Sequence, residues 1–209
     1  MNKAIPLVQS SAILAFHARC TANRSWAKNR EREFAEGAWS FIELNHRFNN
    51  LLWDEEDLAR RTDVGDAEIA ANKRAIDRYN QNRNNAIENI DECILSSLAG
   101  IARGDDACLN SETAGSMIDR MSILSLKVFH MGLQLQRTDV DAAHIESCTQ
   151  KQTRLCEQRD DLAACFDNLL TECRSGRGYY KIYRQFKMYN DPTLNPYLYG
   201  AAGEGARKA

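Results

Sequence analysis

Polar side chains interrupt the apolar stripe of a long helical segment near the middle of the chain. Between residues 67 and 102, isoleucine and leucine recur at helical spacing, yet between Ile76 and Ile87 the same line carries Asn80 and Arg83. Beside this line lie Lys73, Asp77, Asn84 and Asp91. A buried polar group without a partner costs about 1–3 kcal/mol. We therefore expect these residues either to form a paired network that fixes the helix register or to bind a ligand.

A second helical segment, over residues 31–62, has one apolar stripe and one face of mixed chemistry. The stripe, which runs from Phe34 to Leu58, is typical of a bundle helix that faces a core. The other face carries Trp39, Ile42, His46, Asn49, Trp53, Glu56, Asp57 and Arg60. Glu56 and Arg60 alone are typical of an ordinary surface pair at i,i+4, but surfaces that simply face water rarely include two tryptophans. For His46, a hydrogen-bonded packing role is the alternative to a ligand or base.

The segment over residues 112–137 is apolar on nearly all sides, which predicts the central helix of the fold. Asp119, Lys127 and His130 project from it, and charges on a buried helix must be paired. Their expected partners are the polar faces of the two preceding helices. The sequence thus predicts one internal polar seam to which three helices contribute.

Such a seam could hold an anion and move a proton. The cations that would hold a phosphate or carboxylate are Arg83, Lys127, Arg184 and Lys187. The candidates for the general base are Asp57 and Asp77, with His46 and His130 as alternatives. The expected ligand is an anionic small molecule, phosphorylated or carboxylated and sugar-like.

The last segment of the chain interleaves basic and aromatic residues. Six of the seven tyrosines lie between Tyr179 and Tyr199, and Arg174 to Asn190 holds five Lys or Arg and no acid. This composition predicts either cations that close over the ligand or a structural tail that packs on the bundle through its tyrosines.

Helices must position all of these residues. The three prolines stand at Pro6, Pro192 and Pro196, which leaves residues 7–191 free for long helices. Small breakers predict helices near residues 6–20, 31–62, 67–102, 112–137 and 141–174, with a sixth, shorter one over 178–189. We expect an all-α fold, a single-domain antiparallel bundle of five to six helices over residues 1–199, with the C-terminal segment packed on it and a flexible tail over 200–209.

The composition excludes several classes of protein. The 209 residues carry a net charge of −2, with 44% hydrophobic and 27% charged residues, which is typical of a globular domain and argues against a nucleic-acid partner. No stretch is apolar enough for a membrane span, and the broken apolar run near the N-terminus does not indicate a signal peptide. Seven cysteines without a C-x-x-C pair indicate free thiols, so we expect a cytoplasmic protein. Zinc motifs, glycine-rich phosphate loops and Ser/His/Asp patterns are absent.

Two further functions stay open, and with them the question of whether the chain is an enzyme. Asp54-x-x-Asp57 and Glu88-x-x-Asp91 are similar to the carboxylate pairs of helical, magnesium-dependent nucleotide pyrophosphohydrolases. We expect no cofactor unless these pairs hold magnesium. A helical adaptor would instead dock a glycosyltransferase, or a second copy of itself as a homodimer, through the Trp39 and Trp53 face or the tyrosine-rich segment.

Four motifs carry a resemblance to a known family. They are Leu52-Trp-Asp-Glu-Glu-Asp57 with Arg60, Lys73-Arg-Ala-Ile-Asp77 with Asn80, Gln81 and Arg83, Ser111-Glu-Thr with Ile118 to Lys127, and Phe186 to Pro192 with Asn195 and Pro196. In this order they resemble a bacterial family catalogued only as domain of unknown function forty-two fifty-four. The resemblance implies a helical bacterial protein, often encoded beside genes for lipopolysaccharide and glycan assembly, without an established activity.

Periodicity and resemblance together give the residues we expect at the site. The ligand-binding residues are Trp53, Glu56, Arg60, Lys73, Asn80, Gln81, Arg83, Asp119, Arg120, Lys127, Lys187 and Asn190. The catalytic candidates are Asp57, Asp77 and His130. Asn85 stands where similar sequences tend to carry Asp, so a metal ligand at that position is in doubt, and we predict no metal residues.

Overall fold

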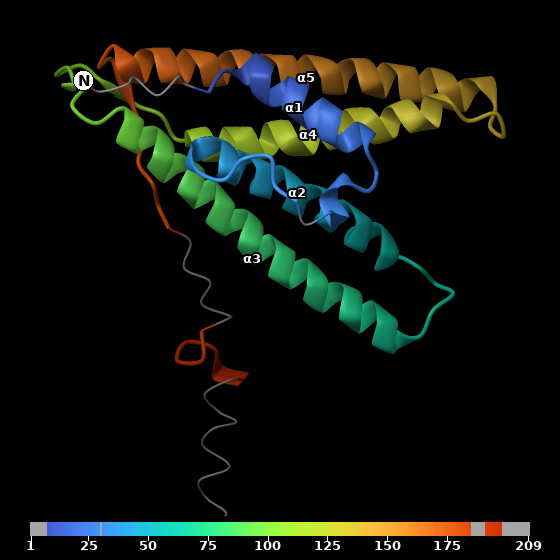
Figure 1. Ribbon diagram of the computed structural model, residues 1–209. Helices are drawn as coiled ribbons and strands as arrows, with labels where there is room; N and C mark the ends of the chain where they lie inside the picture. Colours follow the sequence, from blue (N-terminus) through green and yellow to red (C-terminus); the bar gives the residue numbers. More distant parts are fainter. Residues whose placement is uncertain (1–7, 30, 185–190, 198–209) are drawn as a thin grey trace, which may run out of the picture.

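The computed structural model describes residues 8–29, 31–184 and 191–197, and within these ranges the chain forms five α-helices (Figure 1). They are α1 (Ser10–Ala22), α2 (Gly37–Leu58), α3 (Asp66–Ser97), α4 (Ala114–Leu135) and α5 (Ala142–Arg174). A 3₁₀ turn, η1 (Trp26–Lys28), lies between α1 and α2. Two short strands, β1 (Cys108–Leu109) and β2 (Gly178–Tyr179), pair in parallel. The predicted all-α, single-domain bundle is confirmed.

Two helical hairpins and one crossing helix make the bundle. α2 and α3 form one antiparallel hairpin, α4 and α5 form the other, and α1 lies against α4 and α5 (Figure 1). α4 contacts each of the other four helices. It is therefore the central helix, as its apolar sequence predicts.

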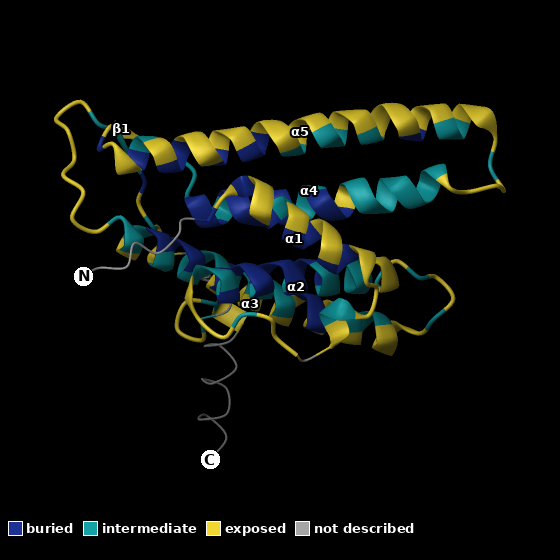
Figure 2. Cartoon of the chain, turned by 45° about the horizontal axis from the view of Figure 1, so that its top comes forward, coloured by how far each residue is buried: buried dark blue, intermediate teal, exposed yellow. Residues whose placement is uncertain are grey.

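Apolar side chains from all five helices meet in one core. Fully buried members come from every helix in turn, and they are Ile13, Ile42, Ile90, Ile118, Met121 and Phe166. Each such side chain stabilises the fold by about 1.5–3 kcal/mol relative to an exposed one. The buried residues form continuous stripes on the inward faces of the helices, while the outer face of α5 is largely exposed (Figure 2).

The start of α4 is fixed by two independent sets of hydrogen bonds. The Thr113 hydroxyl accepts from the Ser116 N–H at 3.1 Å, and the Ser116 hydroxyl accepts from the Thr113 N–H at 3.0 Å. This reciprocal pair is a capping box. The buried Asp91 of α3 also accepts from the Gly115 N–H at 2.6 Å. α4 is thereby held in register with α3 just before its polar residues begin.

α2 is buried on two faces. Its apolar stripe packs toward α3, where the rings of Phe48 and Tyr79 stack 6.2 Å apart, and ends at the exposed Leu58. The more deeply buried face is the polar one that looks toward α1 and α4, and it carries Glu43, Asn45, His46, Arg47 and Asn49. The mixed face is therefore an internal surface rather than a solvated one.

The segment between α1 and α2 is held by one ion pair on α2. Glu43 and Arg47 stand at i,i+4 with 2.9 Å between Oε1 and Nη2, and both are buried. The Glu43 carboxylate accepts from the backbone N–H of Glu33 and Phe34, each at 3.0 Å. The Arg47 guanidinium donates to four backbone carbonyls, those of Trp26, Ala27, Asn29 and Glu31. One side-chain pair thus orders the connection that the sequence assigns partly to helix.

The helix ends differ from the expected ones mainly at breakers. α2 begins at Gly37 rather than near residue 31, and α3 ends at Ser97 rather than near 102. The sixth helix expected over residues 178–189 is wrong for its described part. Gly176 has φ +73° and ends α5, and β2 then bonds to β1, so that residues 180–184 continue without helix, with Tyr180 in the core and Arg184 paired with Glu92 of α3.

Only part of the C-terminal segment can be placed. Tyr180 is buried in the core, whereas Tyr183 and Tyr197 are 74% and 89% exposed. Residues 185–190 and 198–209, which include Lys187, Asn190 and the expected tail over 200–209, lie outside the described residues. Among the helices that are described, none has the length and apolar character needed to cross a membrane.

Candidate functional site

A cavity of about 290 Å³ opens where α2, α3 and α4 meet. Its walls are formed by Asn49, Leu52, Trp53, Glu56, Asp57, Arg60, Arg83, Ile123 and Leu126. We call it the α2–α3–α4 cavity. Five of these residues, Trp53, Glu56, Asp57, Arg60 and Arg83, are among those that the sequence predicts for the site.

The end of α2 brings acidic and basic groups to one rim of this cavity. Glu56 pairs with Arg60 at 2.9 Å, one helical turn further on, and with Lys73 of α3 at 3.6 Å. All three side chains are more than one-third exposed, so these pairs contribute little to stability. Arg60 and Lys73 are therefore two cations that lie close together, and their exposed side chains can move to contact a ligand.

Arg83 lies on the opposite wall, beside the buried Asp119 of α4. Its Nε is 3.9 Å from Asp119 Oδ1, and this buried nitrogen has no hydrogen-bond partner. The same carboxylate oxygen accepts from Nδ2 of Asn45 at 2.8 Å and from Nδ2 of Asn49 at 2.9 Å. Two amide donors already hold Asp119, so the ion pair with Arg83 is loose and the guanidinium retains donor capacity.

A buried chain of hydrogen bonds continues from Asp119 toward α1. Asn49 Nδ2 also donates to the Ser122 hydroxyl at 3.0 Å, and Ser122 lies 2.8 Å from His46 Nδ1. His46 Nε2 is 3.0 Å from the Thr21 hydroxyl and 3.2 Å from the backbone carbonyl of His17. The seam predicted for three helices therefore reaches a fourth, α1.

His17 and His46 stack on each other in this seam, with ring centroids 4.2 Å apart. Burial lowers the pKa of His46 to about 3. Burial, together with the neighbouring His46, also lowers the pKa of His17 well below its usual 6.5. Both rings are therefore neutral at physiological pH, and His46 serves as a hydrogen-bonded packing residue.

His130 of α4 lies against one wall residue of the cavity, Trp53, and does not itself line the cavity. Its ring stacks on the Trp53 indole at 4.2 Å with an angle of 12° between the planes. Partial burial lowers the pKa of His130, while the nearby Asp57 and Asp54 raise it. Among the catalytic candidates, His130 and Asp57 are thus close enough to interact.

The remaining predicted residues are not brought to this cavity. On α3, Asp77 and Gln81 are exposed, Gln81 donates to Asn85 at 2.9 Å, and Asn80 is half-buried. Asp77 follows the buried Ile76 by one residue and therefore points about 100° away from the core. The expectation that Asp77 belongs to a core-facing surface is wrong.

Arg120 and Lys127 lie on a different side of α4. Both are exposed and line a groove between α4 and α5, where Arg120 pairs with Glu112 at 2.6 Å. The sequence predicts Lys127 inside the polar seam, and this is wrong. Because α4 and α5 leave a groove between them, a lysine on that side of α4 can reach water.

Sequence reasoning missed Asn45, Ser122 and Thr21, which complete the seam. A usable signal exists for each of them. Asn45 precedes Asn49 by one turn and Ser122 follows Asp119 by one turn, so each extends a polar row already recognised. Thr21 follows His17 of α1 by one turn, at the same spacing as Asn45 and Asn49.

The two carboxylate pairs of the pyrophosphohydrolase pattern do not meet. Asn72 of α3 donates to Glu55 of α2 at 2.7 Å. The first carboxylate pair, Asp54 and Asp57, therefore lies beside the part of α3 around residue 72. Glu88 lies sixteen residues further along α3, or about 24 Å at 1.5 Å per residue. Nor do the described residues contain a group of three or more His, Cys, Asp or Glu side chains placed to hold a metal ion. This geometry does not assemble a four-carboxylate magnesium site.

Comparison with known proteins gives a family and no activity. Neither the curated proteins nor the solved structures contain a match to this chain. One family model, described as "Protein of unknown function (DUF4254)", matches residues 39–182. That range holds α2 from Trp39 onward, all of α3, α4 and α5, and every residue that lines the α2–α3–α4 cavity. The chain therefore belongs to the DUF4254 family.

Proposed function

We propose that this protein binds an anionic small molecule, a phosphorylated or carboxylated compound with a sugar-like body, in the α2–α3–α4 cavity. The observation that carries the proposal is Arg83, whose buried Nε has no hydrogen-bond partner at the cavity wall. An unmet guanidinium donor beside a cavity is costly unless an acceptor occupies it. A phosphate or carboxylate oxygen is the acceptor that a guanidinium prefers.

The rest of the cavity fits the other parts of such a ligand. Arg60, with Lys73 nearby through Glu56, supplies a second positive group at the far rim. Glu56 and Asp57 would accept hydrogen bonds from hydroxyl groups, and the Trp53 indole offers a flat apolar wall. Anion and hydroxyl contacts are thus both available within about 290 Å³, the lower end of the usual range for ligand pockets.

Any proton transfer at this site would involve Asp57 and His130. Asp57 lines the cavity. His130 stacks on Trp53 and lies near enough to Asp57 for this carboxylate to raise the His130 pKa against the effect of burial. The proposed function is binding. The seven free cysteines suit a reducing compartment, so the proposal places the protein in the cytoplasm.

The test is a thermal-shift screen with variants. The probes are glucose 6-phosphate, a nucleoside diphosphate sugar, inorganic phosphate and malate, each with and without magnesium. A ligand that binds only the native state must raise the unfolding midpoint. We expect a phosphorylated probe to do so, and Arg83→Gln to weaken its binding about 10- to 100-fold, the usual cost of one charge-assisted contact.

Arg74→Gln is the matched control, because it makes the same change on an exposed residue of the same helix. It should leave binding unchanged. If no probe shifts the midpoint of the native protein, or if the two variants behave alike, the proposal is wrong.

The exposed tyrosines favour the adaptor as a second candidate. Tyr183 and Tyr197 leave most of their rings in water, which is unusual for large aromatic side chains. Trp39 does not support it, because its ring packs inside the fold against Phe34 at 5.2 Å and Phe16 at 5.7 Å. An absence of any ligand shift, together with a dimer in sedimentation that Tyr183→Ser abolishes, would favour the adaptor.

A further inference from the structure

A long groove between α4 and α5 is used neither by the α2–α3–α4 cavity nor by the polar seam. It consists of two adjoining cavities of about 840 and 660 Å³ that share Glu112, Met117 and Cys165. No residue of α1, α2 or α3 lines either cavity. We call it the α4–α5 groove.

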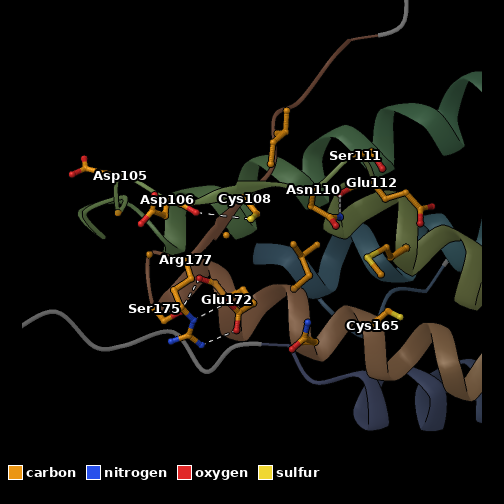
Figure 3. Close-up of a pocket in the computed structure, with 18 residues that line it drawn as sticks. Asp105, Asp106, Cys108, Asn110, Ser111, Glu112, Cys165, Glu172, Ser175 and Arg177 are labelled. Carbon is orange, nitrogen blue, oxygen red and sulfur yellow. Dashed lines mark hydrogen bonds and ion pairs between the residues drawn. The ribbon is translucent and has the colours of Figure 1, made fainter.

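One end of the groove is closed by backbone. Figure 3 shows the loop that carries Asp105, Asp106 and Cys108 on one side and the end of α5 with Glu172 and Arg177 on the other. The loop is fixed there because β1 and β2 pair, and because the Gly104 N–H donates to the Gly176 carbonyl at 2.9 Å. This wall is therefore part of the fold.

The floor is apolar and straight. It is formed by Met117 and Leu124 of α4 and by Leu162 and Leu169 of α5. From Met117 to Lys127 the groove follows α4 for ten residues, or about 15 Å, which equals nearly three helical turns. Two cavities that adjoin at these volumes exceed the roughly 300–1,000 Å³ of a small-molecule pocket.

The rims carry charges that nothing in the described part of the chain neutralises. Arg120 is paired with Glu112, and Arg177 with Glu172. Among the ion pairs between described residues, however, none includes Lys127 on the α4 rim or Asp161 on the α5 rim. Each edge of the groove thus carries one charge outside these ion pairs, Lys127 on the α4 side and Asp161 on the α5 side.

We propose that the α4–α5 groove binds an amphipathic helix of a partner protein, about three turns long. Its apolar residues, at i, i+3, i+4 and i+7, would lie on the floor, as a helix does between two others. Acidic side chains would face Lys127, and basic side chains would face Asp161. The groove and the small-molecule cavity share one lining residue, Ile123 of α4, and the variants that test the two sites lie elsewhere.

The test uses two synthetic, fluorescein-labelled peptides with identical leucine positions. The first has glutamates along one edge of the helix and lysines along the other, and the second has lysines along both. We expect the native protein to bind the first peptide more tightly in fluorescence anisotropy. Lys127→Glu replaces the positive charge on the α4 rim with a negative one. It should weaken binding of the first peptide about two- to fivefold and strengthen binding of the second.

Filling the groove gives a larger effect. Cys165 is exposed and lies in both cavities, so the Cys165→Trp variant should fold. The added ring should weaken binding of the first peptide at least about tenfold. Ala164→Trp is the control, since Ala164 is exposed on α5 and lines neither cavity. Circular dichroism checks that both variants fold. Failure of the native protein to bind either peptide below about 1 mM, or equal effects of the two tryptophans, would overturn the proposal.

Discussion

Two stacked histidines make the core sensitive to acid. His17 and His46 are both fully buried, and the pKa of each is lowered, chiefly by burial. In the unfolded chain both would take up protons near pH 6.5. Below that pH only the unfolded state binds these protons. The free energy of unfolding therefore has its full value above about pH 6.5 and decreases as the pH falls.

Asp91 changes the free energy of unfolding with pH in the opposite direction. Burial raises its pKa from 3.8 to about 6, so the folded state binds a proton that the unfolded state does not hold between these values. Its contribution to stability is therefore lost as the pH rises from about 4 to 6. Two histidines outweigh one carboxylate in this range.

We predict that the free energy of unfolding is about 2–3 kcal/mol lower at about pH 5 than at about pH 7.5, at about 1.4 kcal/mol per pH unit for each group. Urea titrations at the two pH values measure it. In Asp91→Asn the opposing contribution is removed and the loss should be larger. A free energy that stays level or rises toward pH 5 would show that the histidines are not held neutral.

Among the helices, α4 depends on one glycine and not on another. A Cβ added at Gly115 would lie 2.5 Å from the Ile87 carbonyl oxygen and 2.9 Å from Asp91 Oδ2. At Gly132 the nearest atom is Nε2 of Gln152 at 3.2 Å, at the end of a flexible side chain. α4 and α3 are thus in backbone contact near residue 115, whereas near residue 132 only the flexible end of the Gln152 side chain approaches α4 and would have to shift slightly.

We predict that Gly115→Ala destabilises the protein by about 1–3 kcal/mol, because backbone has to move. Gly132→Ala should be neutral or stabilise it by up to about 1 kcal/mol, because alanine favours a helix interior. Thermal unfolding of the two variants decides this. Equal midpoints would contradict the close packing of α3 on α4.

The helices themselves are predictable from sequence, but the direction in which each face points is not. Five segments between breakers are predicted as the main helices, three of them also by helical periodicity, and all five form. Periodicity cannot rank the two faces of α2 by burial, and the polar face with Asn45 and Asn49 is the more deeply buried one. The sixth helix failed because pairing between residues far apart, Cys108 and Gly178, decided the local structure.

The site was predictable to the same extent. Trp53, Glu56, Asp57 and Arg60 share one helix face and stay together whatever that helix packs against. Arg83 joined them because it breaks an apolar stripe. Arg120 and Lys127 were misplaced because a helix that is apolar all round gives no sign of which sides are covered.

At the scale of the whole molecule, α1 is an essential part of the core although the family match begins at residue 39. Its Ile13, Phe16 and His17 are buried, and Ser10 donates to Asp167 of α5 at 2.6 Å. Removing α1 would expose apolar faces of both α4 and α5.

We predict that a chain lacking residues 1–29 loses cooperative thermal unfolding and binds a hydrophobic dye, as expected when specific packing is lost. Adding the peptide 8–24 should partly restore the transition. If the shortened chain unfolds as sharply as the full one, the core does not need α1.

The hydrogen bonds from Arg47 to the segment between α1 and α2 also limit where a protease can cut the chain. One guanidinium bonds to carbonyls over residues 26–31, so the whole connection opens or closes as a unit around a single side chain. Lysine cannot make the same fork of bonds. We predict that Arg47→Lys allows trypsin to nick the chain after Arg24 or Lys28 while the helices stay folded, so that the two fragments elute together until a denaturant separates them.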